Sequence, residues 1–422
     1  MEPSYQNDPA IIALLNDLDS QSALLLPPLT SHCGDITLYD CHKRGPAGRD
    51  YSNKLVYAPE RGTALYAGGS HGTLRPNDVW ELHLGSNSWH MLFAPEGGNH
   101  ALLKGPLYYH AFPKLTKDPK TKLPEKEQLA FDKARTWWKE HAHFRDGHVV
   151  TKSGGPIMPS HTWDAFTYDA SVKKIIWGLG AGPGSDAKYH GLMSDGPLVK
   201  GNPDYTNMWT FEPATNRWHH YQTKQSRPDL RGMGATMTYI PELKKTIYYV
   251  SAQNVTPPEF EMWTYDAAND KWEDLKPNKG TEIRKLSLDL DLAPRSEQQS
   301  AYSPKAKTLV SVLGPNAYAY DLEKNEWSKI CHDPRIDAHD ARSVFAYDSA
   351  ADVFLLANPK SKKAKLAAFS LKTKEWTVLE KQGNTFPKVQ WGNPRGYYDP
   401  EHNVFVIHHG HSNRIWIYRH SK

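Results

Sequence analysis

The side chains best suited to chemistry are histidines and tyrosines at the ends of apolar, strand-like runs. His161 stands just before the run WDAFTYD, and Tyr189 with His190 lies in the glycine-rich loop after KIIWGLGAG. Histidine and tyrosine can act as general base or general acid once their surroundings adjust their pKa values. Arg231 precedes the next strand-like run and offers a permanent charge that binds a carboxylate in bidentate fashion. These four side chains form the candidate catalytic set, with base and acid left unassigned among the two histidines and the tyrosine.

Other polar residues recur at corresponding places along the chain. Arginines precede several strand-like runs, and histidine or asparagine follows the next apolar run. An array of guanidinium groups suits a polyanion or an acidic sugar, although polar residues at such places also tie neighbouring elements together. We expect substrate contacts from His71, His110, Arg49, Asn254, Arg295, Arg342 and Arg395.

A histidine cluster near the C-terminus is the candidate metal site. His409 and His411 would point to the same side of a strand, because side chains alternate along it. With a third ligand such as His71 they could hold a structural divalent ion, zinc or calcium, whereas the acid–base set requires no cofactor. Cys33 and Cys41 lie eight residues apart and could form a disulfide, with reduced thiols as the alternative.

Composition favours an all-β protein. Of the 422 residues, 11% are aromatic, and glycine and proline number 29 and 31, which suits short strands joined by turns. The net charge of +4 gives no reason to expect a nucleic-acid partner. No run is apolar enough to cross a bilayer, and the N-terminus lacks the pattern of a secretion signal. We expect a monomer that does not bind membranes, in a secreted or periplasmic location after removal of a signal.

A repeating unit of about 50 residues extends from about residue 50 to the C-terminus. Each copy joins a tyrosine, a turn, an apolar strand, a loop, an aromatic strand and a tryptophan. The tryptophan recurs at spacings of 54, 55 and 49 residues, at Trp218, Trp272, Trp327 and Trp376. Together with the Gly68–Gly69 pair, this pattern resembles the kelch family, whose repeats build β-propellers of four-stranded blades. The resemblance implies six blades, or seven if an insertion hides one.

The expected organisation is a single propeller domain with two additions. Residues 1–29 form an N-terminal helix, expected over 8–25, and a linker, and residues 30–422 form the propeller. The sixth copy lacks its outer strand, and the segment GDITLYDC (34–41) is the expected donor that closes the ring. Residues 100–160 interrupt the first repeats as an insertion with a helix-like run over 124–144. Long insertions in regular scaffolds often cover sites, so we expect a lid.

The acid–base set and the arginines resemble those of propeller-fold polysaccharide lyases, of the type that cleaves ulvan or rhamnose–glucuronate linkages. This resemblance implies a lyase that cleaves an acidic, uronic-acid-containing and possibly sulfated polysaccharide by β-elimination. His161, Tyr189 and His190 would move protons, and Arg231 would neutralise the carboxylate. Two alternatives stay open: a non-catalytic kelch module that binds a protein or a glycan, and a sugar epimerase or isomerase.

Overall fold

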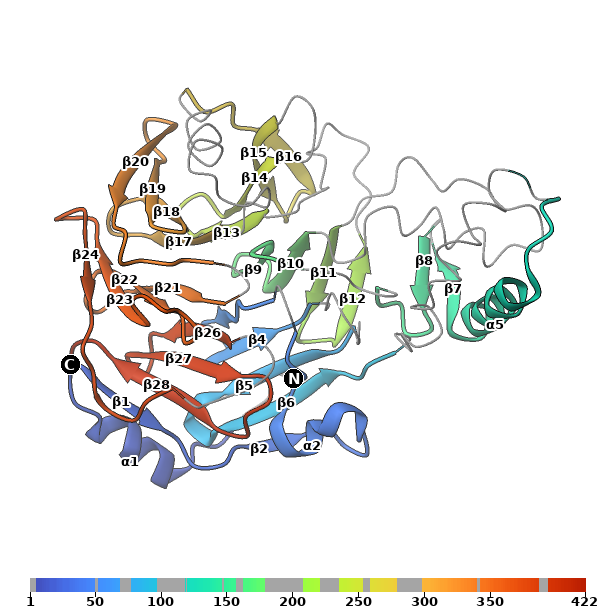
Figure 1. Ribbon diagram of the computed structural model, residues 1–422, viewed down its shortest axis with the longest axis horizontal. Helices are drawn as coiled ribbons and strands as arrows, with labels where there is room; N and C mark the ends of the chain where they lie inside the picture. The colour runs from blue at the N-terminus through green and yellow to red at the C-terminus, as the bar shows by residue number, and fades with distance from the viewer. Residues whose placement is uncertain are drawn as a thin grey trace.

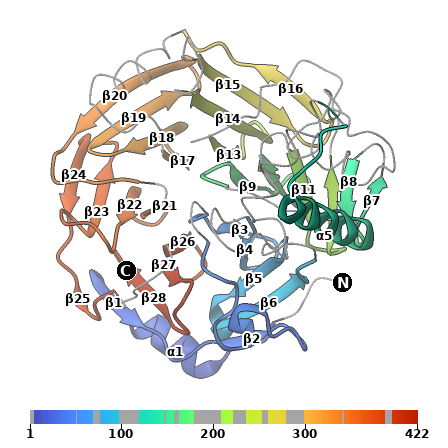
Figure 2. The same cartoon turned by 45° about the vertical axis from the view of Figure 1, so that its right-hand side comes forward.

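Six sheets arranged around one axis form most of the described part of the chain (Figure 1, Figure 2), and a seventh sheet, of two strands, lies in the insertion. The computed structural model describes residues 5–49, 52–68, 77–96, 118, 120–145, 148–156, 162–178, 208–220, 235–252, 259–278, 298–339, 342–386 and 394–422. The innermost strands contact one another in the order β3, β9, β13, β17, β21, β26 and back to β3. The fold is therefore a six-bladed β-propeller, as the repeats predicted.

The blades are antiparallel sheets of consecutive strands, numbered here from the N-terminal side. Blade 1 contains β3 (Val56–Ala58), β4 (Thr63–Tyr66), β5 (Val79–His83) and β6 (Ser88–Phe93); blade 2 contains β9 (Phe166–Asp169), β10 (Lys174–Gly178), β11 (Met208–Glu212) and β12 (Arg217–His220); blade 3 contains β13 (Thr236–Ile240), β14 (Lys245–Ala252), β15 (Glu259–Asp266) and β16 (Lys271–Asp274).

The other three blades follow the same order. Blade 4 contains β17 (Gln299–Ser303), β18 (Thr308–Leu313), β19 (Asn316–Asp321) and β20 (Glu326–His332); blade 5 contains β21 (Val344–Asp348), β22 (Val353–Ala357), β23 (Leu366–Ser370) and β24 (Glu375–Val378); blade 6 contains β26 (Pro394–Asp399), β27 (Val404–His409) and β28 (Ile415–Arg419).

The recurring tryptophans hold the blades together. Each sits on the outer strand and pairs in register with an aromatic residue of the third strand, as Trp272 does with Tyr265 and Trp327 with Tyr320. The ring centroids of these two pairs lie 4.7 and 5.2 Å apart. Both tryptophans are at most 5% exposed. Aromatic cross-strand pairs of this kind bury large areas between blades and so explain the repeat pattern.

Ring closure uses a different N-terminal segment from the one predicted. Strand β1 (Ser22–Leu25) pairs antiparallel with β28 and parallel with β25 (Gln382–Gly383), which completes blade 6. A further strand, β2 (Thr30–His32), adds to β6 in parallel. The donor is thus 22–25, and the prediction of a strand over 34–41 is wrong.

Backbone geometry explains why 34–41 is not a strand. Tyr39 and Asp40 have φ angles of 47° and 56°, and Gly34 has a φ of 56°, values that no extended strand contains. The segment instead forms a turn, the 3-10 helix η1 (Leu38–Asp40) and the short helix α2 (Cys41–Arg44). The Tyr39 hydroxyl donates to Asp78 Oδ2 over 2.5 Å, which fixes this turn against blade 1.

The predicted N-terminal helix is present but shorter. Helix α1 spans Pro9–Asp17 and begins with an Asp8 side chain that accepts from the Ala10 N–H, an ordinary N-cap. The residues from 22 to 25 belong to β1, so the helix does not reach residue 25. In the insertion, helix α5 (Glu125–His141) matches the predicted run and is followed by the hairpin of β7 (Ala142–Arg145) and β8 (His148–Thr151). The lid stays a prediction, because residues 97–117 lie outside the described residues.

Candidate functional site

Most of the predicted site lies outside the described residues. This applies to the whole candidate catalytic set and to four of the predicted substrate contacts, namely His161, Tyr189, His190, Arg231, His71, His110, Asn254 and Arg295. Their roles therefore stay predictions. The structure does place the remaining members: three arginines and two histidines.

Arg49 and Arg395 lie inside the protein, where the N-terminal segment meets blades 1 and 6. Both are 1% exposed. Arg49 forms an ion pair with Asp78 over 2.5 Å and donates to the Gly68 carbonyl oxygen. Arg395 donates to the carbonyl oxygens of Ala47 and Pro46, each over 2.9 Å. In the described structure both arginines therefore connect neighbouring elements of the protein. The sequence left this structural role open as the alternative to substrate binding.

The other three placed residues differ in exposure: Arg342 and His411 are exposed, whereas His409 is buried. Arg342 precedes β21 by two residues, as the sequence predicted for an arginine before a strand-like run. The ring centroids of His409 and His411 are 6.3 Å apart, and Arg44 Nη1 lies 3.1 Å from His411 Nδ1. Within the described ranges, no group of three histidine, cysteine or acidic side chains is arranged to hold a metal ion. The zinc or calcium site at these histidines stays a prediction.

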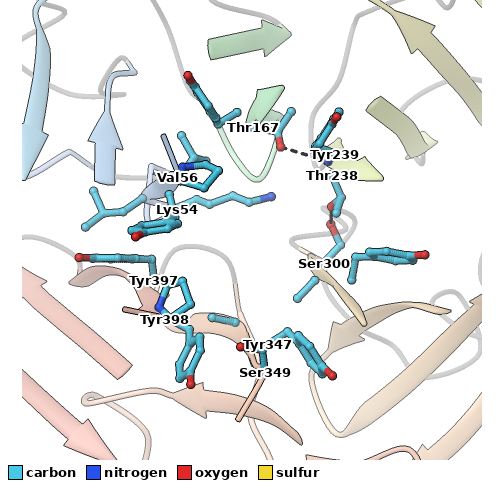
Figure 3. A pocket seen from close by; sticks show the side chains of 18 of the residues that line it. Lys54, Val56, Thr167, Thr238, Tyr239, Ser300, Tyr347, Ser349, Tyr397 and Tyr398 are labelled. Atoms are coloured by element: carbon cyan, nitrogen blue, oxygen red, sulfur yellow. Dashed lines mark hydrogen bonds between the residues drawn. The ribbon is translucent and has the colours of Figure 1, made fainter. Parts of the chain in front are cut away.

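The described residues instead enclose a cavity on the propeller axis (Figure 3). Its volume is about 650 Å³, which lies in the range typical of small-molecule sites. Its walls come from the innermost strands of blades 1 to 6 and from the turns that lead to each second strand, and the lining includes Pro59, Pro241, Pro304 and Pro400. The cavity therefore opens at the end of the propeller axis where the turns between the first and second strands of each blade lie. We call it the axial cavity.

Seven tyrosines line the axial cavity, namely Tyr397 and six that occupy the same position in the six innermost strands. The six equivalent residues are Tyr57, Tyr168, Tyr239, Tyr302, Tyr347 and Tyr398. The same residues mark the start of each repeat in the sequence. Because the strands are equivalent, the repeat brings its tyrosines to one level around the axis, and we call them the tyrosine ring. Tyr239, Tyr347 and Tyr398 are labelled in Figure 3.

Turn side chains accept hydrogen bonds from the hydroxyls of this ring. Tyr302 donates to Glu242 Oε2 over 3.0 Å and Tyr347 to Asp352 Oδ1 over 2.7 Å. Tyr168 donates to Glu60. Burial, together with the neighbouring Asp352 carboxylate, raises the pKa of Tyr347 to about 12. Burial also raises the pKa of Tyr168, with Glu60 adding to the effect. Phenols with raised pKa values stay protonated at neutral pH, so the ring offers neutral aromatic surfaces and not a base.

An ion pair crosses the other end of the axial cavity. Lys54 precedes β3 and reaches across the axis, where its Nζ donates to the Met237 carbonyl oxygen over 2.7 Å and to Asp164 Oδ2 over 3.2 Å. The same carboxylate oxygen accepts from the backbone N–H of Ser300 over 3.1 Å and from its Oγ over 2.7 Å. This network, the axial clasp, joins residues of blades 1 to 4 (Figure 3 shows Lys54 and Ser300).

The clasp is only partly accessible to water. The side chain of Lys54 is 17% exposed and that of Asp164 is 5% exposed. Burial raises the pKa of the Asp164 carboxyl, while Lys54 and Ser300 oppose part of that shift. Thr238 Oγ1 lies 2.8 Å from Ser300 Oγ, so the cavity floor carries an ammonium and hydroxyl groups. An aromatic wall over a small polar floor is the usual composition of a ligand site.

Sequence reasoning treated the tyrosines only as alignment markers and gave Lys54 no role. A signal was nevertheless present, since one tyrosine per copy at the start of the innermost strand must converge on the axis of a closed ring. Three residues before the tyrosine, where Lys54 stands, only the sixth copy also has a basic residue, Arg395, so the repeat pattern did not point to Lys54.

The comparisons with known proteins give remote structural similarity. No protein-family model and no curated protein matches it. Among solved structures, auxiliary nutrient binding proteins from Bacteroides thetaiotaomicron and Bacteroides ovatus are 9% and 10% identical, each covering 94% of this chain and 76% of theirs, with a TM-score of 0.46. TolB from Acinetobacter baumannii is 13% identical over 50% of this chain and 51% of its own, with a TM-score of 0.28. Likeness at this level assigns no function.

Among the helices that the structure describes, none is long and apolar enough to cross a bilayer.

Proposed function

We propose that the chain is a carbohydrate-binding β-propeller whose ligand site is the axial cavity. The observation that carries this proposal is the tyrosine ring around a cavity of about 650 Å³. Sugars present C–H faces that pack on aromatic rings and hydroxyls that need hydrogen-bonding partners, and the cavity offers both kinds of group. A volume of this size accommodates a short oligosaccharide or the end of a longer chain.

The described residues favour binding over catalysis at this site. Three phenols of the ring donate to carboxylates, and Asp164 is held by Lys54 and Ser300. β-Elimination needs a free base beside a neutralised carboxylate, and the tyrosine ring supplies neither. His161, Tyr189 and Arg231, the predicted lyase residues, lie outside the described residues, so lyase chemistry stays a separate prediction. The proposal therefore follows the non-catalytic glycan-binding alternative.

Isothermal titration calorimetry against a panel of oligosaccharides tests the proposal. Tyr57→Ala and Tyr239→Ala each remove one partly exposed ring from the cavity wall. Because an aromatic contact contributes about 1 kcal/mol, each should weaken binding roughly fivefold. Tyr5→Ala is the matched control, since Tyr5 is also partly buried but stacks on His90, with ring centroids 4.1 Å apart, away from the cavity.

Two outcomes would contradict the proposal. If Tyr5→Ala weakened binding as much as the two ring variants, the ligand would not bind in the axial cavity. If no oligosaccharide of the panel bound, the proposed carbohydrate-binding function would be wrong. The same samples, followed by ultraviolet absorbance of an unsaturated product, show whether a uronic-acid polymer is cleaved.

A further inference from the structure

The charges at the two ends of the axial cavity point to the class of saccharide that it takes. At the rim, the carboxylates of Glu60 and Glu242 accept from hydroxyls of the tyrosine ring. Asp352 also accepts from Tyr347, but its other oxygen lies 2.8 Å from Lys305 Nζ, so its charge is paired. At the floor, Lys54 supplies an ammonium group. Lys54 is the only lysine, arginine, histidine or acidic residue among the residues lining this described cavity.

An anionic ligand is disfavoured at the rim. A uronate or sulfate group among the tyrosines would approach the turn carboxylates, and like charges at short range repel unless a cation lies between them. Lys54 does not compensate, because its charge is already balanced by Asp164, with 3.2 Å between Nζ and Oδ2. The cavity lining contains no arginine that could bind a carboxylate in bidentate fashion.

A cationic ligand is disfavoured at the floor. An amino sugar placed deep in the cavity would need an acceptor for its ammonium group, and the Asp164 oxygen that faces Lys54 already accepts three hydrogen bonds, from Lys54 and from Ser300 N and Oγ. The carboxylates that could attract a cation lie at the turns, each holding a tyrosine hydroxyl. Anionic ligands are thus disfavoured at the rim and cationic ligands at the floor.

A neutral polyol suits the same floor. An ammonium group has three N–H donors, and the hydrogen bonds of Lys54 to Asp164 and Met237 occupy two of them. The remaining donor can serve a sugar hydroxyl or ring oxygen without disturbing the ion pair. Thr238, whose hydroxyl lies 2.8 Å from Ser300 Oγ, lines the cavity beside it.

We infer that the axial cavity selects neutral saccharides over uronic acids and amino sugars, with Lys54 as its polar contact at the floor. This inference rests on the proposed function and specifies the ligand class of the same site. It differs from the acidic glycan expected from the arginines and histidines of the sequence, most of which lie outside the described residues.

Calorimetry with matched disaccharides tests this selectivity. The probes are cellobiose, mannobiose, galactobiose and xylobiose as neutral ligands, digalacturonic acid as the anion and the glucosamine dimer as the cation. The best neutral disaccharide should bind at least about tenfold more tightly than either charged one at low ionic strength. Equal or tighter binding of a charged disaccharide overturns the inference and leaves the carbohydrate function in place, whereas no binding by any of the six overturns the function itself.

A gain of binding provides a test that misfolding cannot imitate. The double variant Glu60→Gln, Glu242→Gln removes two rim charges but keeps an oxygen that can accept from Tyr168 and Tyr302. Its affinity for digalacturonic acid should rise by about threefold or more, while its affinity for the neutral ligand stays unchanged. Glu273→Gln is the control, because Glu273 is an exposed partner of Lys245 outside the cavity lining. An unchanged ratio in the double variant would contradict the role of the rim charges.

Discussion

Replacing Lys54 by methionine should destabilise the propeller, because it leaves the Asp164 carboxylate buried without its cation. The side chain of Asp164 is 5% exposed and would keep only the two hydrogen bonds from Ser300. Removing one partner of a buried ion pair costs about 3–5 kcal/mol. Since Lys54 itself is 17% exposed, water can reach the pair, and the lower end, about 3 kcal/mol, is expected.

The corresponding shift in melting temperature follows from the size of the chain. With about 2.1 cal/mol/K of unfolding entropy per residue and 422 residues, the unfolding entropy is about 0.9 kcal/mol/K. A loss of about 3 kcal/mol therefore lowers Tm by about 3 °C. Differential scanning calorimetry at pH 7 measures this change directly.

The control is a lysine of similar pairing on the surface. Lys245 lies 3.0 Å from Glu273, with side chains 31% and 60% exposed, and Lys245→Met should lower Tm by less than about 1 °C. The double variant Lys54→Met, Asp164→Leu removes both charges and should recover most of the loss. Equal Tm values for Lys54→Met and Lys245→Met would refute the axial clasp as a stabilising element.

Three further predictions concern other parts of the fold. Trp327→Ala, at a site 2% exposed between blades, should cost about 3–5 kcal/mol in chemical denaturation; a loss below about 1 kcal/mol would contradict the packing. Burial lowers the pKa values of His90 and His339 to about 4. Between about pH 6.5 and pH 4 the unfolded chain therefore binds protons that the folded chain does not, and stability should fall as the pH drops through this range. His90→Gln should make Tm depend less on pH. The thiols of Cys33 and Cys41 are in contact, with 3.0 Å between the sulfur atoms. Oxidation by a small-molecule disulfide should join them and raise the free energy of unfolding by about 2.5 kcal/mol. If an alkylating reagent still modified both cysteines after oxidation, this prediction would be contradicted.

Much of the fold could be predicted because it depends on local, repeated features. The spacing of Trp218, Trp272, Trp327 and Trp376 marks equivalent outer strands, and each is at most 5% exposed in the structure. A tryptophan that recurs at the same strand position indicates the same packing environment in each copy, so the sequence pattern predicts the blade. The number of blades follows in the same way.

Ring closure was harder to predict because it depends on contacts across almost the whole chain. The segments 22–25 and 34–41 both contain apolar residues suited to a strand, and only one can pair with β28. The positive φ angles of Tyr39 and Asp40 decide the choice, and they are enforced by bonds such as that from Tyr39 to Asp78. No local propensity reports a contact of that kind.

The site was predicted least well, for a related reason. Arginines before the innermost strands were expected to face a ligand, but Arg49 and Arg395 are buried among carbonyl oxygens, Asp78 and aromatic rings. A charged residue type in a sequence does not tell whether its partner is a ligand or the protein itself. The tyrosine ring was visible in every repeat, yet its meaning depends on closure around an axis, which only the assembled fold provides.

The central claim is that the axial cavity binds carbohydrate, and a variant that fills the cavity tests it most directly. Ala346 lines the cavity, whereas Ala350 lies in the exposed turn of the same blade and is not part of the lining. Calorimetric titration of the best disaccharide should show no detectable binding to Ala346→Trp and unchanged binding to Ala350→Trp. Binding of the ligand to Ala346→Trp with the affinity of the unmodified protein would contradict the account.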